Sequence, residues 1–255
     1  MARRIVITSG KGGVGKTTLS YLIGKRLAKL NKRTLVIDLD LSLNNLDVVA
    51  GVEDKVNYFL EDVISGKCRA KQALVECSEN LFIMQSSHSL DTLVNGHNVK
   101  LLADGLSENF DFIFFDCPAG LDAGFHRAVS CADEALVVIT LYPTSLRDAD
   151  KVVNILKSYK LSALYAVANR VRRDLVSRGK CVAEEDCEEI LKIPVIASVP
   201  EDDGVLLLGG GDLSRFSPAR AATVKLAKKL VKEDFAFISG EYKKQFERIK
   251  RKVVK

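Results

Sequence analysis

A glycine-rich loop directly behind an apolar strand constrains this chain more than any other feature. Residues 10–18 read Gly-Lys-Gly-Gly-Val-Gly-Lys-Thr-Thr and follow the apolar run 5–7. This order matches the phosphate-binding pattern G-x-x-x-x-G-K-[ST] between a strand and a helix. The glycines let backbone N–H groups turn toward phosphate oxygens, and the positive end of the following helix adds to the attraction. The loop therefore predicts an α/β fold that binds nucleotide phosphates.

Two lysines in the loop have different expected roles. Lys16 is placed to reach the β- and γ-phosphates, and the hydroxyl of Thr17 is placed to ligate Mg²⁺. Lys11 lies among the glycines, where a wrapped loop projects its side chain outward toward the phosphates of a second subunit. Nucleotide contacts are predicted for the whole loop, namely Gly10, Lys11, Gly12, Gly13, Val14, Gly15, Lys16, Thr17 and Thr18.

Composition excludes several classes of protein. The 255 residues are 47% hydrophobic, which suits one sizeable core, and no run of about 18 apolar residues predicts a membrane-spanning helix. The start of the chain lacks a signal-peptide pattern, so we expect a cytoplasmic protein. Six cysteines occur without a C-x-x-C pair, and reduced thiols are expected.

Segments with the apolar spacing of a strand alternate along the chain with segments that have the apolar spacing of a helix. Strands are expected at 3–8, 34–38, 81–85, 111–116, 134–140, 163–169 and 194–199. Helices are expected at 17–30, 56–64, 70–75, 99–108, 147–159, 184–191 and 218–232. This alternation predicts a mostly parallel twisted sheet flanked by helices, in one phosphate-loop domain over residues 1–238. A separate tail is expected over 239–255.

Three aspartates follow strands on the side of the sheet where the loop emerges. Asp38 and Asp40 follow the apolar residues 34–37 of the second strand, in Val-Ile-Asp-Leu-Asp, and Asp116 ends the strand 111–116. Carboxylates at such strand ends hold Mg²⁺ in phosphate-loop enzymes, often through water. Capping or turn aspartates are the alternative for any one of them.

The loop KGGVGKTT resembles the deviant Walker A loop of the MinD/ParA superfamily of dimerising ATPases. The resemblance implies ATP and Mg²⁺ as cofactors and a homodimer in which Lys11 reaches the partner's nucleotide. It also implies that Asp40 activates the attacking water, that Asp38 and Asp116 belong to the metal shell, and that Gly120 lets its loop move. Family positions that contact adenine match Asn169, Arg170, Pro200, Glu201 and Asp202, although two ordinary strand-end turns are the alternative reading.

Similarity to the MinD branch runs nearly end to end. It includes S-L-N-N-L-D at 42–47, S-L-R-D-A-D at 145–150 and V-P-E-D at 199–202. The chain departs from the branch at Ser42 and Asn44, where glycine and arginine are usual. The resemblance implies a slow, partner-stimulated ATPase in division-site placement, with a MinC-like inhibitor and a MinE-like activator as partners. The start of the helix 147–159, with Arg147, Asp148 and Asp150, is the expected partner face.

The last residues form a basic amphipathic segment. Residues 241–255 hold seven of the 38 basic and two of the 33 acidic residues, which leaves 31 of each in residues 1–240. Apolar residues recur at helical spacing, and we expect the segment to bind an anionic membrane surface on its inner face. A terminal helix packed on its own domain is the alternative. The expected membrane residues are Tyr242, Phe246, Ile249, Val253, Lys243, Lys244, Arg248, Lys250 and Arg251.

Three other functions share parts of this pattern. A ParA-like partition ATPase would bind DNA through basic residues of the body, but the body is neutral, and DNA does not require the apolar stripe around Phe246. We therefore do not expect a nucleic-acid partner. An iron–sulfur carrier would need cysteine spacing that Cys181 and Cys187 do not provide. A flagellar-placement relative of the MinD branch stays compatible with every motif.

Overall fold

The parallel sheet that the sequence predicts forms the centre of the protein. The computed structural model describes residues 1–41, 44–87 and 94–233. Within them, eight strands form one sheet in the order β3-β4-β2-β5-β1-β6-β7-β8, and all neighbours are parallel except the pair β3–β4. The strands are β1 (Arg3–Thr8), β2 (Thr34–Asp38), β3 (Val75–Ser78), β4 (Leu81–Met84), β5 (Phe112–Asp116), β6 (Glu134–Ile139), β7 (Ala163–Val171) and β8 (Val195–Pro200).

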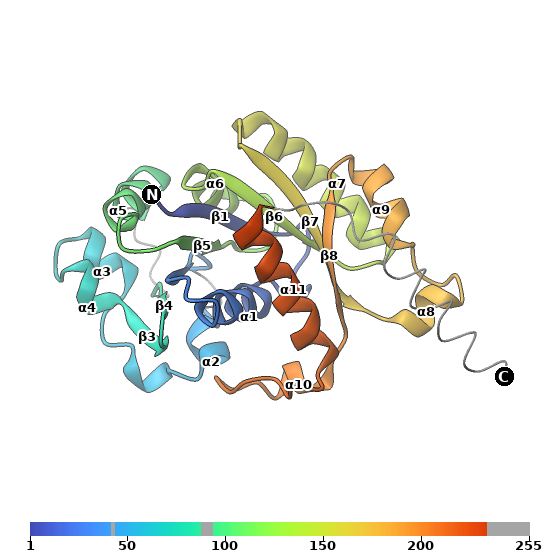
Figure 1. Ribbon diagram of the computed structural model, residues 1–255. Coiled ribbons are helices and arrows are strands. Elements are labelled where there is room, and N and C mark those ends of the chain that lie inside the picture. Colours follow the sequence, from blue (N-terminus) through green and yellow to red (C-terminus); the bar gives the residue numbers. More distant parts are fainter. Residues whose placement is uncertain (42–43, 88–93, 234–255) are drawn as a thin grey trace.

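Helices cover both faces of this sheet (Figure 1). Helices α1 (Lys16–Ala28) and α11 (Pro218–Lys232) contact each other and pack on one face, while α7 (Pro143–Leu156) and α9 (Glu184–Leu191) pack together on the other. The alternation of strand side chains feeds a separate apolar core on each face, with Val6 in one and Ile7 in the other. The remaining helices are α2 (Leu46–Ala50), α3 (Leu60–Ile64), α4 (Ala70–Ala73), α5 (Gly96–Leu106), α6 (Ala123–Ser130), α8 (Arg173–Ser177), α10 (Asp203–Leu206) and the 3-10 turns Glu53–Lys55 and Lys157–Tyr159.

Several sequence-based boundaries differ from the structure. The expected helix 70–75 ends at Ala73, because the chain then turns into the edge strand β3, which pairs antiparallel with β4. The expected helix 56–64 begins only at Leu60. Helix α7 begins at Pro143, where proline suits the first helical position, so the partner face expected at a helix start lies one turn inside the helix.

Strand register brings the phosphate loop and the aspartates to one edge of the sheet. Ile7 pairs with Asp116, and Asp116 pairs with Asp38, so the carboxyl ends of β1, β5 and β2 lie in a row. In the described part of the chain, no helix is both long and apolar enough to cross a bilayer. The predicted membrane tail, including Tyr242, Phe246 and Ile249, lies outside the described residues, as does Ser42.

Candidate functional site

The phosphate loop wraps from β1 to the first turn of α1. Gly15 takes a φ of 89°, and a Cβ at this position would lie 2.6 Å from the Nδ2 atom of Asn169, so glycine is required for both conformation and space. Lys16, the first residue of α1, is 9% exposed, whereas Lys11 is exposed as the sequence predicts. The loop therefore presents one inner and one outer lysine.

Two carboxylates lie buried below the loop. Asp38 and Asp116 are each 1% exposed and stand in register on neighbouring strands. The Ser20 hydroxyl of α1 donates to Asp116 Oδ1 at 3.2 Å, and the backbone N–H of Asp40 donates to Asp38 Oδ1 at 2.9 Å. Asp40 itself is partly exposed. The two buried groups thus lie side by side on neighbouring strands, and the third aspartate lies nearer the surface.

Burial controls the ionisation of this pair. Desolvation raises the pKa of Asp116 to about 6, against the opposing effects of the Thr17 hydroxyl and the Lys16 ammonium. Burial, and then the charge of Asp116, raises the pKa of Asp38 well above its ordinary range. A cation between the loop and these strands would offset both effects, and the oxygen donors of Thr17, Asp38 and Asp116 suit Mg²⁺.

Carboxylates alone do not complete a metal site here. Among the described residues, no three His, Cys, Asp or Glu side chains converge as a metal-holding group. Mg²⁺ in phosphate-transfer sites takes only one or two carboxylates and completes its shell with water and substrate phosphates. The donor set fits that arrangement, whereas no described cysteine, including Cys181 and Cys187, belongs to a metal-holding group.

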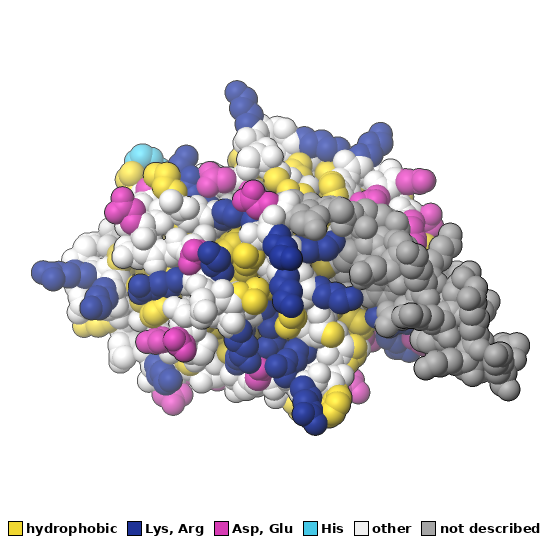
Figure 2. All heavy atoms as spheres, in the orientation of Figure 1, with side chains coloured by type: hydrophobic (Ala, Val, Ile, Leu, Met, Phe, Trp, Pro, Cys, Tyr) yellow, Lys and Arg dark blue, Asp and Glu magenta, His cyan; other side chains and the backbone are white. Residues whose placement is uncertain are grey.

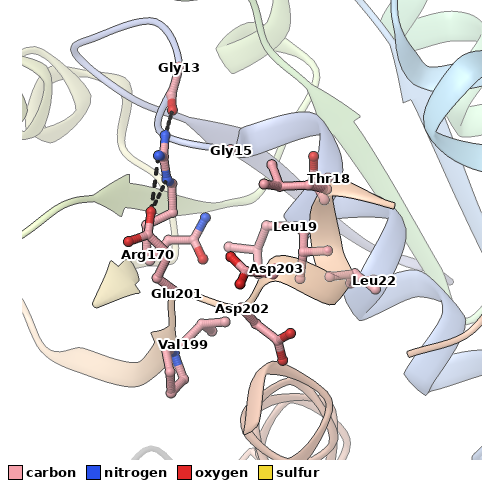
Figure 3. A pocket seen from close by; sticks show the side chains of 14 residues that line it. Gly13, Gly15, Thr18, Leu19, Leu22, Arg170, Val199, Glu201, Asp202 and Asp203 are labelled. Carbon is pink, nitrogen blue, oxygen red and sulfur yellow. Dashed lines mark hydrogen bonds and ion pairs between the residues drawn. The ribbon is translucent and has the colours of Figure 1, made fainter. Parts of the chain in front are cut away.

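A pocket of about 360 Å³ opens beside the loop, at the carboxyl ends of β7 and β8 (Figure 3). The five residues expected at the base line it together, namely Asn169, Arg170, Pro200, Glu201 and Asp202. Two of them also hold the phosphate loop: Asn169 Nδ2 donates to Val14 O at 2.8 Å, and an Arg170 guanidinium N–H donates to Gly13 O at 3.0 Å. Glu201 accepts hydrogen bonds from Arg170 at 3.1 and 3.3 Å, which fixes the guanidinium over the pocket.

The pocket has walls that sequence reasoning missed. Leu19 and Leu22 come from α1, Val199 comes from β8, and Asp203, Val205 and Leu206 come from α10. Asp202 is the N-cap of α10, because its Oδ1 accepts from the Gly204 N–H at 2.9 Å. The capping pattern Asp-Asp-Gly after Pro200 was the available signal for α10.

Known proteins share this sequence over most of its length. Residues 2–166 match a family described as "AAA domain". The "Putative septum site-determining protein MinD" of Emiliania huxleyi is 44% identical over 209 residues, covering 81% of this chain and 77% of the relative. The chain belongs to the MinD family.

Solved structures of MinD-family proteins share the fold as well. The MinC:MinD cell division protein complex of Aquifex aeolicus contains a chain that is 36% identical, with a TM-score of 0.84, covering 90% of this chain and 96% of that one. MinD from Pyrococcus horikoshii, solved with Mg-ADP, is 30% identical with a TM-score of 0.81, covering 90% of this chain and 96% of its own. The α/β fold predicted from the sequence is therefore confirmed.

Proposed function

We propose that this chain is a Mg²⁺-dependent ATPase of the MinD family that acts in placing the cell-division site. The observation that carries the proposal is the joint geometry of the site: a phosphate loop, two buried carboxylates in register below it and a base-sized pocket beside it. The MinD relative solved with Mg-ADP supports ATP and Mg²⁺ as the ligands. Name and fold of the relatives support the role in division.

The chemistry follows from the residues around the loop. Loop N–H groups and Lys16 hold the β- and γ-phosphates, and Asp40 orients a water for in-line attack on the γ-phosphorus. The new P–O bond forms as the bond to the β-phosphate oxygen breaks, and the water's protons pass to phosphate or solvent. Thr17, Asp38 and Asp116 would hold Mg²⁺, which would supply neutralisation of the negative charge that develops in the reaction.

Dimerisation is the proposed control of ATP hydrolysis. Lys11 is exposed, and in the proposed ATP-bound homodimer it contacts the nucleotide of the second subunit. Each site then lacks a cation until two chains meet. A cation supplied across an interface accelerates phosphoryl transfer by about 1,000-fold or more.

Helix α7 is the proposed surface for MinC-like and MinE-like partners. Arg147 is exposed, and Asp148 and Asp150 are partly exposed. The helix also touches the catalytic loop, because a Cβ on Gly10 would lie 2.4 Å from the carbonyl oxygen of Asp148. A partner bound to α7 is therefore one backbone contact from the phosphate site. The relative from Aquifex aeolicus, solved together with MinC, supports the inhibitor as a partner.

Membrane binding is assigned to the tail, residues 239–255. Helix α11, which leads to it, contains no acidic residue and exposes Lys225, Lys228 and Lys232 on one face. Figure 2 shows Lys and Arg side chains gathered over α11. Each basic residue near an anionic leaflet contributes about 1 kcal/mol, so one tail binds weakly, while two tails on a dimer gain about 100-fold from avidity. ATP would thereby control whether the protein binds peripherally to the inner face of the membrane.

Sedimentation with anionic vesicles tests the proposal. The full chain is expected to hydrolyse ATP and to pellet with vesicles in ATP but not in ADP. The variant Phe246→Glu is expected to lose pelleting, while Leu101→Glu, the same change at a 56% exposed site on α5, keeps it. Absence of vesicle binding together with ATP-dependent binding to double-stranded DNA would refute the membrane role and favour the partition class. Absence of ATP hydrolysis even with vesicles would refute the ATPase.

A further inference from the structure

Two consecutive residues at the end of β4 contact the loop that carries Asp38 and Asp40. Ile37 of β2 pairs with Met84 of β4, so Gln85 follows at the level of Asp38. The amide Nε2 of Gln85 donates to Asp38 Oδ2 at 3.2 Å. Since the other oxygen of Asp38 already accepts from the Asp40 N–H, both carboxylate oxygens are held in place.

The next residue, Ser86, holds the far end of the same loop. Asn44 Nδ2 donates to the carbonyl oxygen of Ser86 at 2.8 Å, and the Ser86 hydroxyl donates to Asn44 Oδ1 at 2.9 Å. The Asn44 N–H donates in turn to Asp40 O at 3.2 Å. Gln85 and Ser86 are therefore bonded to residues on both sides of Asp40. Gln85 holds Asp38, which precedes Asp40, and Ser86 holds Asn44, which follows it. Asn44 occupies a position where MinD proteins usually have arginine, and in this chain its side chain pairs with Ser86.

Burial shields the contacts of Gln85 and Ser86 from bulk water. Gln85 is 1% exposed and Ser86 is not exposed at all, so neither side chain can exchange its protein partner for bulk water. The Oε1 atom of Gln85 is buried and has no hydrogen-bond partner among the described residues. An amide that donates to a metal-shell carboxylate and keeps a free acceptor beside it suits a hydrated cation, whose waters donate hydrogen bonds.

We infer that Gln85 and Ser86 are positioning residues for hydrolysis: Gln85 orients Asp38 and accepts from a water of the Mg²⁺ shell, and Ser86 with Asn44 holds the Asp40 loop. This inference rests on the proposed ATPase function. It goes beyond it by placing two residues outside the family motifs in the same apparatus. Neither residue contacts ATP in this scheme, so nucleotide affinity without metal is independent of both.

Paired variants separate positioning from stability. Gln85→Met keeps the side-chain volume and removes both polar atoms, and the Mg²⁺ concentration for half-maximal hydrolysis is expected to rise by about tenfold. Ser86→Ala removes the hydroxyl, and kcat is expected to fall about tenfold at unchanged KM, as for one lost hydrogen bond in the reacting state. Ser107→Ala is the matched control, because its buried hydroxyl donates to Ala103 O at 2.8 Å, in the helix α5.

Three measurements decide the outcome. ATP binding in EDTA is expected to be the same in all variants. Urea unfolding is expected to show similar losses of unfolding free energy for Ser86→Ala and Ser107→Ala. Of these two serine variants, only Ser86→Ala is expected to have a lower kcat. Equal hydrolysis and Mg²⁺ dependence in Gln85→Met, Ser86→Ala and the control would overturn the inference.

A loop-side variant covers the case in which the buried substitutions unfold the protein. Asn44→Ala removes both bonds to Ser86 from a partly buried position and must lower kcat if the inference holds. An unchanged kcat in this variant overturns the positioning role assigned to the contact between Ser86 and Asn44. An inactive natural chain refutes the ATPase function itself, and Asp40→Ala supplies the zero level for every rate.

Discussion

A close contact between two glycine-containing turns predicts a large difference between neighbouring substitutions. Gly210 has a φ of 76°, and a Cβ there would lie 2.3 Å from the backbone oxygen of Ala50 at the end of α2. Gly209 has a φ of 39°, but a Cβ there would meet nothing within 4 Å. Alanine at either position adds backbone strain, and only Gly210→Ala adds a collision with main-chain atoms that no side-chain rotation relieves.

The contacts of Gly210 set the magnitude. Its carbonyl oxygen accepts from the Lys25 ammonium at 2.9 Å, and its N–H donates to Val49 O at 3.1 Å. A left-handed alanine costs about 1 kcal/mol, and a shift of the turn weakens both bonds at about 1 to 2 kcal/mol each. We expect Gly210→Ala to lower the free energy of unfolding by about 4 kcal/mol, and Gly209→Ala by about 1 kcal/mol.

Thermal unfolding and nucleotide titration measure the two consequences. For a chain of this size, each kcal/mol of lost stability lowers the Tm by about 2 to 4 °C, so the Tm of Gly210→Ala should lie about 10 °C below that of the natural chain. The turn follows α10, whose Leu206 lines the pocket, so ATP affinity should fall in Gly210→Ala and hold in Gly209→Ala. Equal destabilisation of the two variants would refute the role assigned to the contact with Ala50.

Three further predictions concern separate parts of the molecule. Lys11→Ala should bind ATP as a monomer and hydrolyse it about 1,000-fold more slowly, which sedimentation velocity and phosphate release would measure. Asn169→Ala loses the 2.8 Å bond to the phosphate loop and should weaken ATP binding by about fivefold in calorimetry; unchanged affinity would show that the loop keeps its shape without it. Burial acts to raise the pKa of Asp212, but hydrogen bonds from Arg26 and Lys29 outweigh it and hold the pKa well below its usual range. Asp212→Asn should therefore destabilise the fold at pH 7, with a difference in urea unfolding from the natural chain that shrinks below pH about 4, where the unfolded carboxyl takes up a proton. A difference independent of pH would contradict the assignment to the charged pair.

Strand-end residues were predictable because their positions depend on neighbours in the chain. The phosphate loop follows β1 directly, and Asp38 and Asp116 follow apolar runs that read as buried strands. Parallel strands end at one edge, so these groups must meet once the sheet forms. The family resemblance, rather than the strand ends alone, pointed to Asn169 and Pro200, and both line the pocket.

The edge of the sheet was less predictable. Val75 begins β3, a short strand whose partner β4 lies across a turn, and its sequence fits a helix end equally well. Leu19 and Leu22 have the spacing of an ordinary apolar helix face, and the opening beside α10 turns part of that face into pocket wall. The function assigned to the tail stays a prediction, because residues 239–255 lie outside the described chain.

The sequence by itself determined the fold class, the phosphate loop and the acidic strand ends, because glycine, lysine and aspartate at fixed spacing carry their chemistry in local order. Tertiary structure alone decided that Gln85 lies beside Asp38, that Asn44 pairs with Ser86, and that the turn at Gly210 packs against the end of α2. Each of these contacts joins segments about 40 or more residues apart, and their register depends on how strands and helices pack rather than on any local pattern.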